Sequence, residues 1–436
     1  MRKTTFFLAF VSFLAAVGVR YTSAQVTTGI QPFGSYGGGP DAVNLANLNV
    51  HLDIPIRSKA GRGLNFIYAL GYDTAVWTPV DGFWTPAYNF GWTAETQTET
   101  GYVTATTNLW KCFSGGSWYW ATTYARWIYY DRKGTPHPFS LPTISTCSTF
   151  PSSASGSAED GSGYQISAYP GSAVIEDAGG RTLNPPFQVG TGSGTVKDTN
   201  GNEITFNGTT YTDTLGTSAL TVSGTSPVNY SYTGPTGTEQ YVVSYRSYTV
   251  RTHFGCSAPG DYGPTSVSLV DKITLPDSSY YQFTYEPTPG YSGDVTGRLA
   301  AVQLPTGGTI SYAYSGGSNG ITCTDGSTAT LTRTTPDGTW KYVHSESGSA
   351  WTTTVTDPQN DQTTLNFQDY SANTTTYYAK SEYETERQVY ECKPSARNDH
   401  HVLQRTHVKL QLNSSDCTDS SQNGVRSVAR IAKQRI

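Results

Sequence analysis

Few residues in this chain have the spacing of a reaction centre, and three glycines come closest to a known chemical motif. Gly190, Gly192 and Gly194 imitate the glycine-rich loop that cradles a phosphate group. Such a loop follows a strand, opens a helix and ends in Lys, and this segment has neither a helical pattern nor the Lys. We therefore predict a flexible turn here rather than a nucleotide site.

Oxygen ligands for a metal ion lie close together in one segment. Asp198, Asn200 and Asn202 resemble the beginning of a calcium-binding loop. Gly201 comes too early for such a loop, and no distal Glu stands where the bidentate ligand belongs. The segment therefore favours a hairpin turn, with a bound calcium ion as the lesser alternative.

A histidine cluster near Asp399 is the second candidate for metal chemistry. Its members are His400, His401 and His407. A zinc or nuclease site is one interpretation, and a solvated basic tail is the other. We favour the tail. We expect no metal, no cofactor and no catalytic residue in this chain.

Aromatic residues are concentrated between positions 77 and 130. Exposed in a row, these rings could stack on sugars, and a pair of carboxylates roughly 5–10 Å apart would then indicate a glycoside-active enzyme. Buried, they would form the core of a β-sandwich, because Trp and Tyr bury large areas. We favour the core. The tryptophans concerned are Trp77, Trp84, Trp92, Trp110, Trp118, Trp120 and Trp127.

The elements that must position these residues are predicted to be strands. The chain has 45 Gly, 31 Tyr and 9 Trp, and only 14% of its residues are charged, against about 25% in average domains. Tyr, Trp and Thr favour strands, and Gly, Asn, Asp and Pro favour turns. We therefore expect an all-β fold, with an aromatic-rich antiparallel domain followed by stacked β-hairpins that form a curved sheet or partial shell.

The first residues have the layout of a secretory signal peptide. Arg2 and Lys3 precede an apolar run over 6–19, and small residues end at Ala24. The run is shorter than the roughly 20 residues that span a bilayer. We expect Sec-type bacterial export with cleavage after Ala24, a secreted or cell-surface location, and no transmembrane segment.

Export also bears on charge and on cysteine chemistry. Cleavage would leave 25 basic residues against 33 acidic ones, a formal net charge of −8, which argues against a nucleic-acid partner. Disulfides become plausible outside the cytoplasm. Six cysteines allow fifteen connectivities, and we expect neighbours to pair: Cys112–Cys147, Cys256–Cys323 and Cys392–Cys417.

Composition divides the chain into successive parts. The first strand pair is predicted over 48–54 and 64–70, with Pro55 ending the first strand and a turn over 59–63. A short helix is expected over 426–436. The parts are a signal peptide (1–24), a flexible lead-in (25–45), an aromatic-rich β domain (46–141), a Ser/Gly/Pro-rich linker (142–163), a β-hairpin repeat region (164–379, clearest at 270–345) and a basic, weakly structured tail (380–436).

Turn prolines recur along the hairpin repeat region. Pro276, Pro305, Pro336 and Pro358 are 29, 31 and 22 residues apart, and alternating aromatic residues follow the first three. Pro presets the first corner of a turn and Gly takes its positive-φ corner, as Gly307 and Gly338 would here. Periods of this length are typical of stacked repeats.

Two segments resemble the Rhs/YD-repeat family of secreted and cell-surface proteins. The first is the sequence over 42–56 and 60–64, which resembles the amino-terminal part of bacterial members. The second is Asp294-Val-Thr-Gly297-Arg298-Leu followed by Leu304-Pro-Thr-Gly-Gly, which is similar to the repeat itself. The resemblance implies a short or truncated member whose repeats wind into a β shell, with Asp294, Gly297 and Arg298 as structural residues.

The resemblance implies a non-enzymatic scaffold that acts in binding, cell contact or toxin encapsulation. Its partner would be a carbohydrate or a protein. One alternative is a carbohydrate-binding module or glycoside-active enzyme that uses the Trp77–Trp127 cluster. Another is a toxin with its tip in 380–436.

Overall fold

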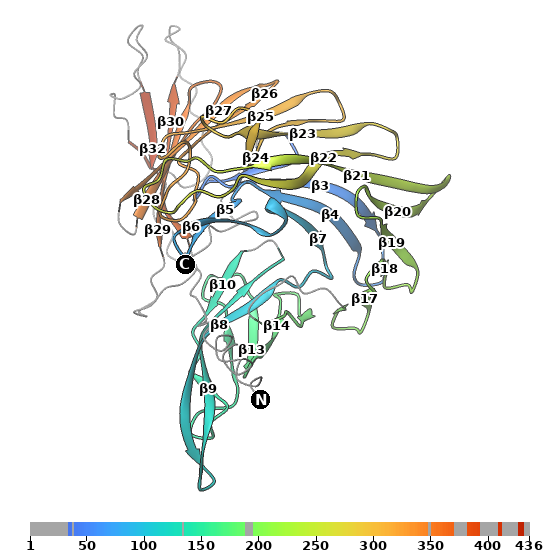
Figure 1. Ribbon diagram of the computed structural model, residues 1–436, viewed down its shortest axis with the longest axis vertical. Coiled ribbons are helices and arrows are strands. Elements are labelled where there is room, and N and C mark those ends of the chain that lie inside the picture. The colour runs from blue at the N-terminus through green and yellow to red at the C-terminus, as the bar shows by residue number, and fades with distance from the viewer. Residues whose placement is uncertain are drawn as a thin grey trace, which may run out of the picture.

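The computed structural model describes residues 34–36, 39–132, 135–187, 195–347, 350–369, 382–392, 409–411 and 426–430. Within these ranges the chain consists of β-strands and one short 3₁₀ helix, η1 (Tyr88–Gly91) (Figure 1). The all-β prediction is confirmed. The signal peptide, the glycines at 190–194 and the histidine cluster lie outside the described residues.

An N-terminal sheet has the strand order β1-β2-β3-β4-β7, all antiparallel. Its strands are β1 (Gly34–Tyr36), β2 (Asp41–Asn44), β3 (Val50–Lys59), β4 (Phe66–Asp73) and β7 (Trp92–Thr96). A small hairpin of β5 (Trp77–Val80) and β6 (Phe83–Pro86) lies between β4 and β7 in the chain. The predicted β3–β4 hairpin is confirmed.

Two expectations about this sheet are wrong. Pro55 does not end the first strand, because the register shifts between Pro55 and Arg57 and the strand continues to Lys59. Such a bulge tolerates a residue that cannot donate to the ladder. Residues 41–45 are not a flexible, exposed lead-in. All four residues of β2 are buried, and Asp41 forms an ion pair with Arg333 inside the molecule.

A long antiparallel sheet forms the second half of the molecule. From β12 to β30 each strand pairs with the next one in the chain, and β21 and β24 also pair in parallel. The first strands are β12 (Ala154–Ser157), β13 (Gln165–Tyr169), β14 (Ser172–Glu176), β15 (Thr182–Leu183), β16 (Val196–Lys197), β17 (Glu203–Phe206), β18 (Thr210–Thr212), β19 (Ser218–Ser223), β20 (Val228–Gly234) and β21 (Gly237–Val250). The later strands are β22 (Thr265–Thr274), β23 (Tyr280–Pro287), β24 (Asp294–Gln303), β25 (Thr309–Ser315), β26 (Thr330–Thr335), β27 (Gly338–Ser347), β28 (Ala350–Thr356), β29 (Gln362–Asp369) and β30 (Glu382–Cys392).

The later strands of the long sheet lie over the N-terminal sheet, and the two share one hydrophobic core (Figure 1). Polar contacts cross this core as well. The Tyr72 hydroxyl donates to the Gly297 carbonyl at 3.1 Å and accepts from the Leu299 amide at 3.0 Å. The Trp77 indole N–H donates to the Thr296 carbonyl at 2.8 Å. The inward face of the long sheet is therefore packed against β2, β3, β4 and β7.

A third sheet contains β8 (Tyr102–Ser114), β9 (Ser117–Tyr130), β10 (Pro136–Phe139) and β11 (Ile144–Ser145). Its base packs on β13 and β14 in a second hydrophobic core that contains Trp127. Residues 46–141, which composition groups together, thus contribute to both cores. The expected linker over 142–163 holds β11 and β12. The β8–β9 hairpin extends away from the body (Figure 1).

Two disulfides lie within the described residues, Cys112–Cys147 and Cys256–Cys323. Both pairings were predicted and are confirmed. The third expected pairing involves Cys417, which lies outside the described residues.

The C-terminal region contributes further strands. Besides β30, the structure places β31 (Lys409–Gln411) and β32 (Arg426–Arg430) here, and β32 pairs with both other strands. The predicted helix over 426–436 is wrong for 426–430, because this segment forms ladder hydrogen bonds instead. Across the part of the chain that the structure describes, no helix has the length and apolarity needed to cross a bilayer.

Candidate functional site

The turn residues singled out in the sequence lie at strand connections along the long sheet. Pro276 lies between β22 and β23. Pro305 and Gly307 lie between β24 and β25, and Pro336 and Gly338 connect β26 to β27. Gly307 adopts a φ of +88°, and its amide donates to the Leu304 carbonyl at 2.8 Å. These residues close turns and do not converge on a common site.

The structural role predicted for three residues of β24 lies in contacts with neighbouring elements. These residues are Asp294, Gly297 and Arg298. Asp294 accepts a hydrogen bond from Arg251 Nε at 2.8 Å, which links β24 to the end of β21. Gly297 has a φ of +84°, and a Cβ there would come within 3.0 Å of the Phe90 ring. The backbone thus approaches η1 closely, and only Gly fits this conformation without strain.

Arg298 is buried and forms a bidentate ion pair with Glu286. Its Nε donates to Glu286 Oε2 and its Nη2 to Oε1, both at 2.8 Å, and the Thr296 hydroxyl donates to Oε2 at 2.6 Å. The guanidinium also lies 4.2 Å from the ring centre of Tyr314. Both Glu286 oxygens thus accept hydrogen bonds, and the guanidinium of Arg298 balances the charge of the carboxylate.

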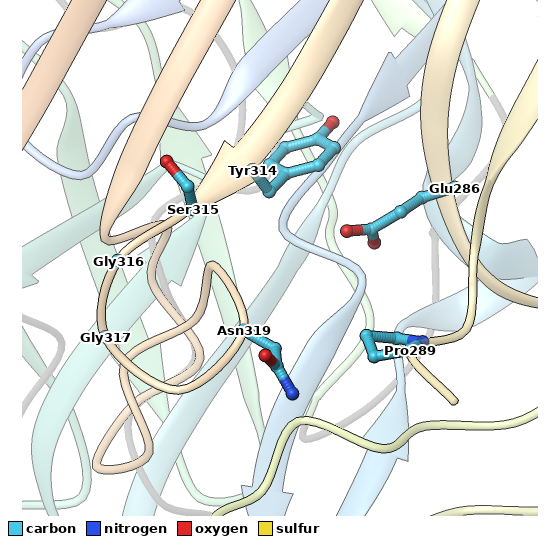
Figure 2. A pocket seen from close by; sticks show the side chains of 7 residues that line it. All are labelled: Glu286, Pro289, Tyr314, Ser315, Gly316, Gly317 and Asn319. Atoms are coloured by element: carbon cyan, nitrogen blue, oxygen red, sulfur yellow. The ribbon is translucent and has the colours of Figure 1, made fainter. Parts of the chain in front are cut away.

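A pocket of about 320 Å³ opens beside Glu286 (Figure 2). Its walls are Glu286, Pro289, Tyr314, Ser315, Gly316, Gly317 and Asn319. The Tyr314 hydroxyl donates to the Leu299 carbonyl at 2.7 Å, and the Asn319 amide donates to the His253 carbonyl at 3.0 Å. The side chains of Glu286, Tyr314 and Asn319, three of the polar groups on these walls, thus form structural hydrogen bonds.

A second buried charge cluster surrounds His51. Its Nδ1 lies 3.0 Å from Asp73 Oδ1, and its Nε2 lies 2.9 Å from Glu95 Oε1, across neighbouring strands of the N-terminal sheet. Burial alone would lower the pKa of His51, but the carboxylates of Asp73 and Glu95 outweigh it and raise this pKa to about 10. A protonated, enclosed imidazolium cannot act as a general base.

The buried charges of Glu286 and His51 are thus paired inside the protein. Within the described ranges, no group of three or more His, Cys, Asp and Glu residues could hold a metal ion. The Asp198–Asn202 segment forms the predicted hairpin turn: Asp198 Oδ1 accepts the amides of Asn200 and Asn202, both at 2.9 Å.

The tryptophans do not form one surface. Trp77, Trp84 and Trp92 are buried in the core shared with the long sheet, and Trp127 is buried in the second core. The core interpretation is correct for these four. Trp118 and Trp120 are different, because both side chains lie in solvent near the tip of the β8–β9 hairpin.

These two tryptophans belong to a face of the hairpin whose large side chains are apolar apart from Lys111. Phe113 lies opposite Trp118 in the ladder, Lys111 opposite Trp120 and Leu109 opposite Thr122, and directly opposed residues share a face. The exposed fractions are 66% for Leu109, 52% for Phe113, 68% for Trp118 and 63% for Trp120. We call Leu109, Lys111, Phe113, Trp118 and Trp120 the aromatic face.

The opposite face of the hairpin packs against the segment that follows β11. Cys112 and Ala121 are buried with Cys147, and Trp110 packs edge-on against Phe150 at 5.7 Å between ring centres. The Cys112–Cys147 disulfide joins the hairpin to the segment after β11. The aromatic face is thus held on a fixed support, and its apolar side chains are not covered by any of the described residues.

Sequence reasoning placed Trp118 and Trp120 in the core with the other tryptophans, which is wrong for these two, although a signal for their exposure was present. Gly115-Gly116 separates the alternating residues Leu109-x-Lys111-x-Phe113 from Trp118-x-Trp120, which is the pattern of a hairpin. The apolar residues lie on the same face of both arms of this hairpin, and the sequence indicates no further strand that would cover that face. Such a pattern indicates an exposed surface.

No protein-family model and no curated protein matches this chain.

Proposed function

We propose that the protein is a non-enzymatic, secreted or cell-surface scaffold of the Rhs/YD-repeat type, which acts by binding through the aromatic face. The observation that carries this proposal is the exposure of four large apolar side chains on one face of a projecting hairpin. Contiguous apolar patches on a protein surface mark interaction sites, because burying them elsewhere is favourable.

The order of strands in the long sheet supports the scaffold part of the proposal. The turns at Pro276, Pro305, Pro336 and Pro358 each join two neighbouring antiparallel strands. This succession fits stacked hairpin units, in which each unit buries its face against the next. Two disulfides fit an oxidising compartment, and so agree with export.

Binding is favoured over encapsulation by the position of the N-terminal sheet. The inward face of the long sheet packs on β2, β3, β4 and β7 through a common core. A cargo would need this same space. A glycoside-active enzyme is disfavoured because four of the seven tryptophans are buried in two separate cores.

The proposal is tested by retention of the fluorescently labelled full-length chain on intact bacterial and animal cells. The key variant is Trp118→Ser with Trp120→Ser, which removes two exposed rings. Tyr88→Ser is the matched control, because Tyr88 is 82% exposed but lies in η1, away from the hairpin. We expect retention of the wild type and of the control, and loss of retention in the double variant. Equal retention of all three proteins would show that the aromatic face is not the binding surface.

A further inference from the structure

We infer that the aromatic face inserts into the headgroup region of a lipid bilayer that contains anionic lipids. This inference rests on the proposed binding function and names the partner of the same surface. It follows from four features of the hairpin: its side-chain types, its local charge, its projection from the body and the arrangement of its rings.

The side-chain types match the boundary between lipid tails and headgroups. Trp carries a large apolar ring and one N–H donor, so it is stable where one side of it is apolar and the other is wet. Trp118 and Trp120 are joined on their face by Phe113 and Leu109, which supply apolar area only. A surface with this composition gains by burial to a shallow depth in a bilayer.

The charge of the hairpin differs from that of the whole protein. Residues 102–130 contain Lys111 and Arg126 and no acidic residue. The segment 141–157, which contains Cys147 and Phe150 on the opposite face of the hairpin, has no charged residue. The whole chain, in contrast, has a formal net charge of −5. Lys111 lies on the aromatic face with its Nζ 5.6 Å from the Trp120 ring centre. An anionic membrane would attract this hairpin and repel the acidic body, which fixes the orientation of approach.

The shape of the hairpin allows it to reach a membrane. The turn at its tip consists of Gly115 and Gly116, both with positive φ, and a Cβ on either would meet nothing within 4 Å. The hairpin projects beyond the other sheets (Figure 1). The tip can therefore enter the headgroup layer before any other element of the described chain touches the membrane.

A glycan fits this face less well. The rings of Phe113 and Trp118 are tilted by 51°, so they do not form the flat platform on which a sugar chain stacks. The ammonium group of Lys111 lies over the ring of Trp120 and competes for its face. The remaining member of the face, Leu109, offers a sugar hydroxyl no hydrogen-bonding side chain. Lipid insertion needs neither a flat platform nor a row of hydrogen-bonding groups.

The experiment measures flotation of the full-length protein with two kinds of vesicle, phosphatidylcholine alone and phosphatidylcholine mixed with phosphatidylglycerol. We expect the wild type to float with both, and more strongly with the mixed vesicles. Trp118→Ser with Trp120→Ser should lower the partition coefficient at least about tenfold on both, because two rings no longer leave water. Tyr88→Ser should partition as the wild type does.

A charge variant separates the electrostatic contribution from the apolar one. Lys111→Gln should weaken binding to the mixed vesicles about fivefold, the equivalent of the ~1 kcal/mol that one basic residue contributes near an anionic surface. The same variant should leave binding to phosphatidylcholine unchanged. A similar loss on both vesicles would overturn the electrostatic part of the inference.

Insertion is read separately from binding by brominated lipids, which quench tryptophan fluorescence on contact. The wild type should be quenched, and the Trp118/Trp120 double variant should lose that quenching while its near-ultraviolet circular dichroism still reports a folded core. Failure of the wild type to float with either vesicle, or equal flotation of the double variant, overturns the inference.

The outcomes distinguish this inference from the proposed function. If cells retain the protein through Trp118 and Trp120 but vesicles do not, the binding function stands and the lipid partner is wrong. If chitin or cellulose oligosaccharides release the protein from cells, the partner is a glycan. If protease treatment of the cells abolishes retention, the partner is a protein. If neither cells nor vesicles bind through the hairpin, both proposals fail.

Discussion

Asp41 and Arg333 lie 292 positions apart in the chain and form a bidentate ion pair in the interior. Arg333 Nε donates to Asp41 Oδ2 at 2.6 Å and Nη2 donates to Oδ1 at 2.7 Å, and the Tyr312 hydroxyl adds a third hydrogen bond at 2.9 Å. The pair fastens β2 of the N-terminal sheet to β26 of the long sheet. Together with the Tyr72–Gly297 contact, it fixes one sheet under the other.

Removing one partner of this pair should be costly. Asp41→Asn would leave the Arg333 guanidinium buried without its counter-ion, and we expect a loss of about 3–5 kcal/mol in the free energy of unfolding. Glu203→Gln is the control, because the Lys197–Glu203 pair is 55% and 41% exposed and should change stability by less than about 1 kcal/mol. Urea unfolding measures both, and equal effects would show that Asp41 does not hold the sheets together.

Two buried histidines should make the protein less stable as pH rises. In the folded state the pKa of His51 is raised to about 10 and that of His137 to about 9, because neighbouring carboxylates outweigh the opposing effect of burial. Both values exceed the ordinary 6.5, so the stabilisation is complete below pH 6.5 and is lost towards pH 9 and 10. The free energy of unfolding should fall by about 1.4 kcal/mol per pH unit for each histidine.

Denaturant unfolding between pH 6 and pH 9 measures this slope. His137→Gln should remove the share that arises from the ion pairs of His137 with Asp131 and Asp160. Its Nε2 lies 3.7 Å from Asp131 Oδ2 and its Nδ1 lies 2.6 Å from Asp160 Oδ2. The His51 share should remain in that variant. A stability that is flat or rises across this window contradicts the assignment.

Glu99 should weaken the fold at neutral pH. Burial raises its pKa to about 7, so the folded state keeps a proton there that the unfolded chain releases above its ordinary value of 4.5. The penalty is absent below pH 4.5 and complete above pH 7. Glu99→Gln should therefore raise the free energy of unfolding by about 1–3 kcal/mol at pH 8, and have less effect at pH 4. Thermal unfolding at the two pH values tests this, and a larger gain at the acidic value would contradict it.

Local patterns predicted the class of fold but not the contacts between sheets. The alternation over 48–54 and the turn prolines are local signals, and they indicated strands and turns correctly because each depends on a few neighbouring residues. The lead-in was misread because the partner of Asp41 lies far along the chain. Likewise, Trp77 is buried and Trp118 is exposed. This difference depends on which sheet covers each strand, and a short window of sequence does not contain that information.

The Cys112–Cys147 disulfide should stabilise the hairpin and not the core shared by the N-terminal and long sheets. It encloses a segment with a sequence separation of 35, and loops of this length correspond to about 3–4 kcal/mol of unfolded-state entropy. We expect Cys112→Ser with Cys147→Ser to speed amide hydrogen exchange over 102–130. Exchange in β22–β27 should not change, because these strands pack in the other core. Faster exchange throughout the chain would show that the two cores unfold together.

Gly297 and Gly307 provide a matched pair that separates backbone strain from close packing. Their φ angles are +84° and +88°, so an Ala at either position pays a similar conformational cost, about 1–2 kcal/mol. A Cβ at Gly307 meets nothing within 4 Å, whereas one at Gly297 comes within 3.0 Å of Phe90. Gly297→Ala should therefore cost more than Gly307→Ala in urea unfolding. Shortening the clashing side chain by Phe90→Leu should remove part of the excess, because the pair is then coupled in a double-mutant cycle. Equal costs for the two glycine variants would mean that Gly297 is needed for its φ alone, and that the close approach of β24 to η1 contributes nothing.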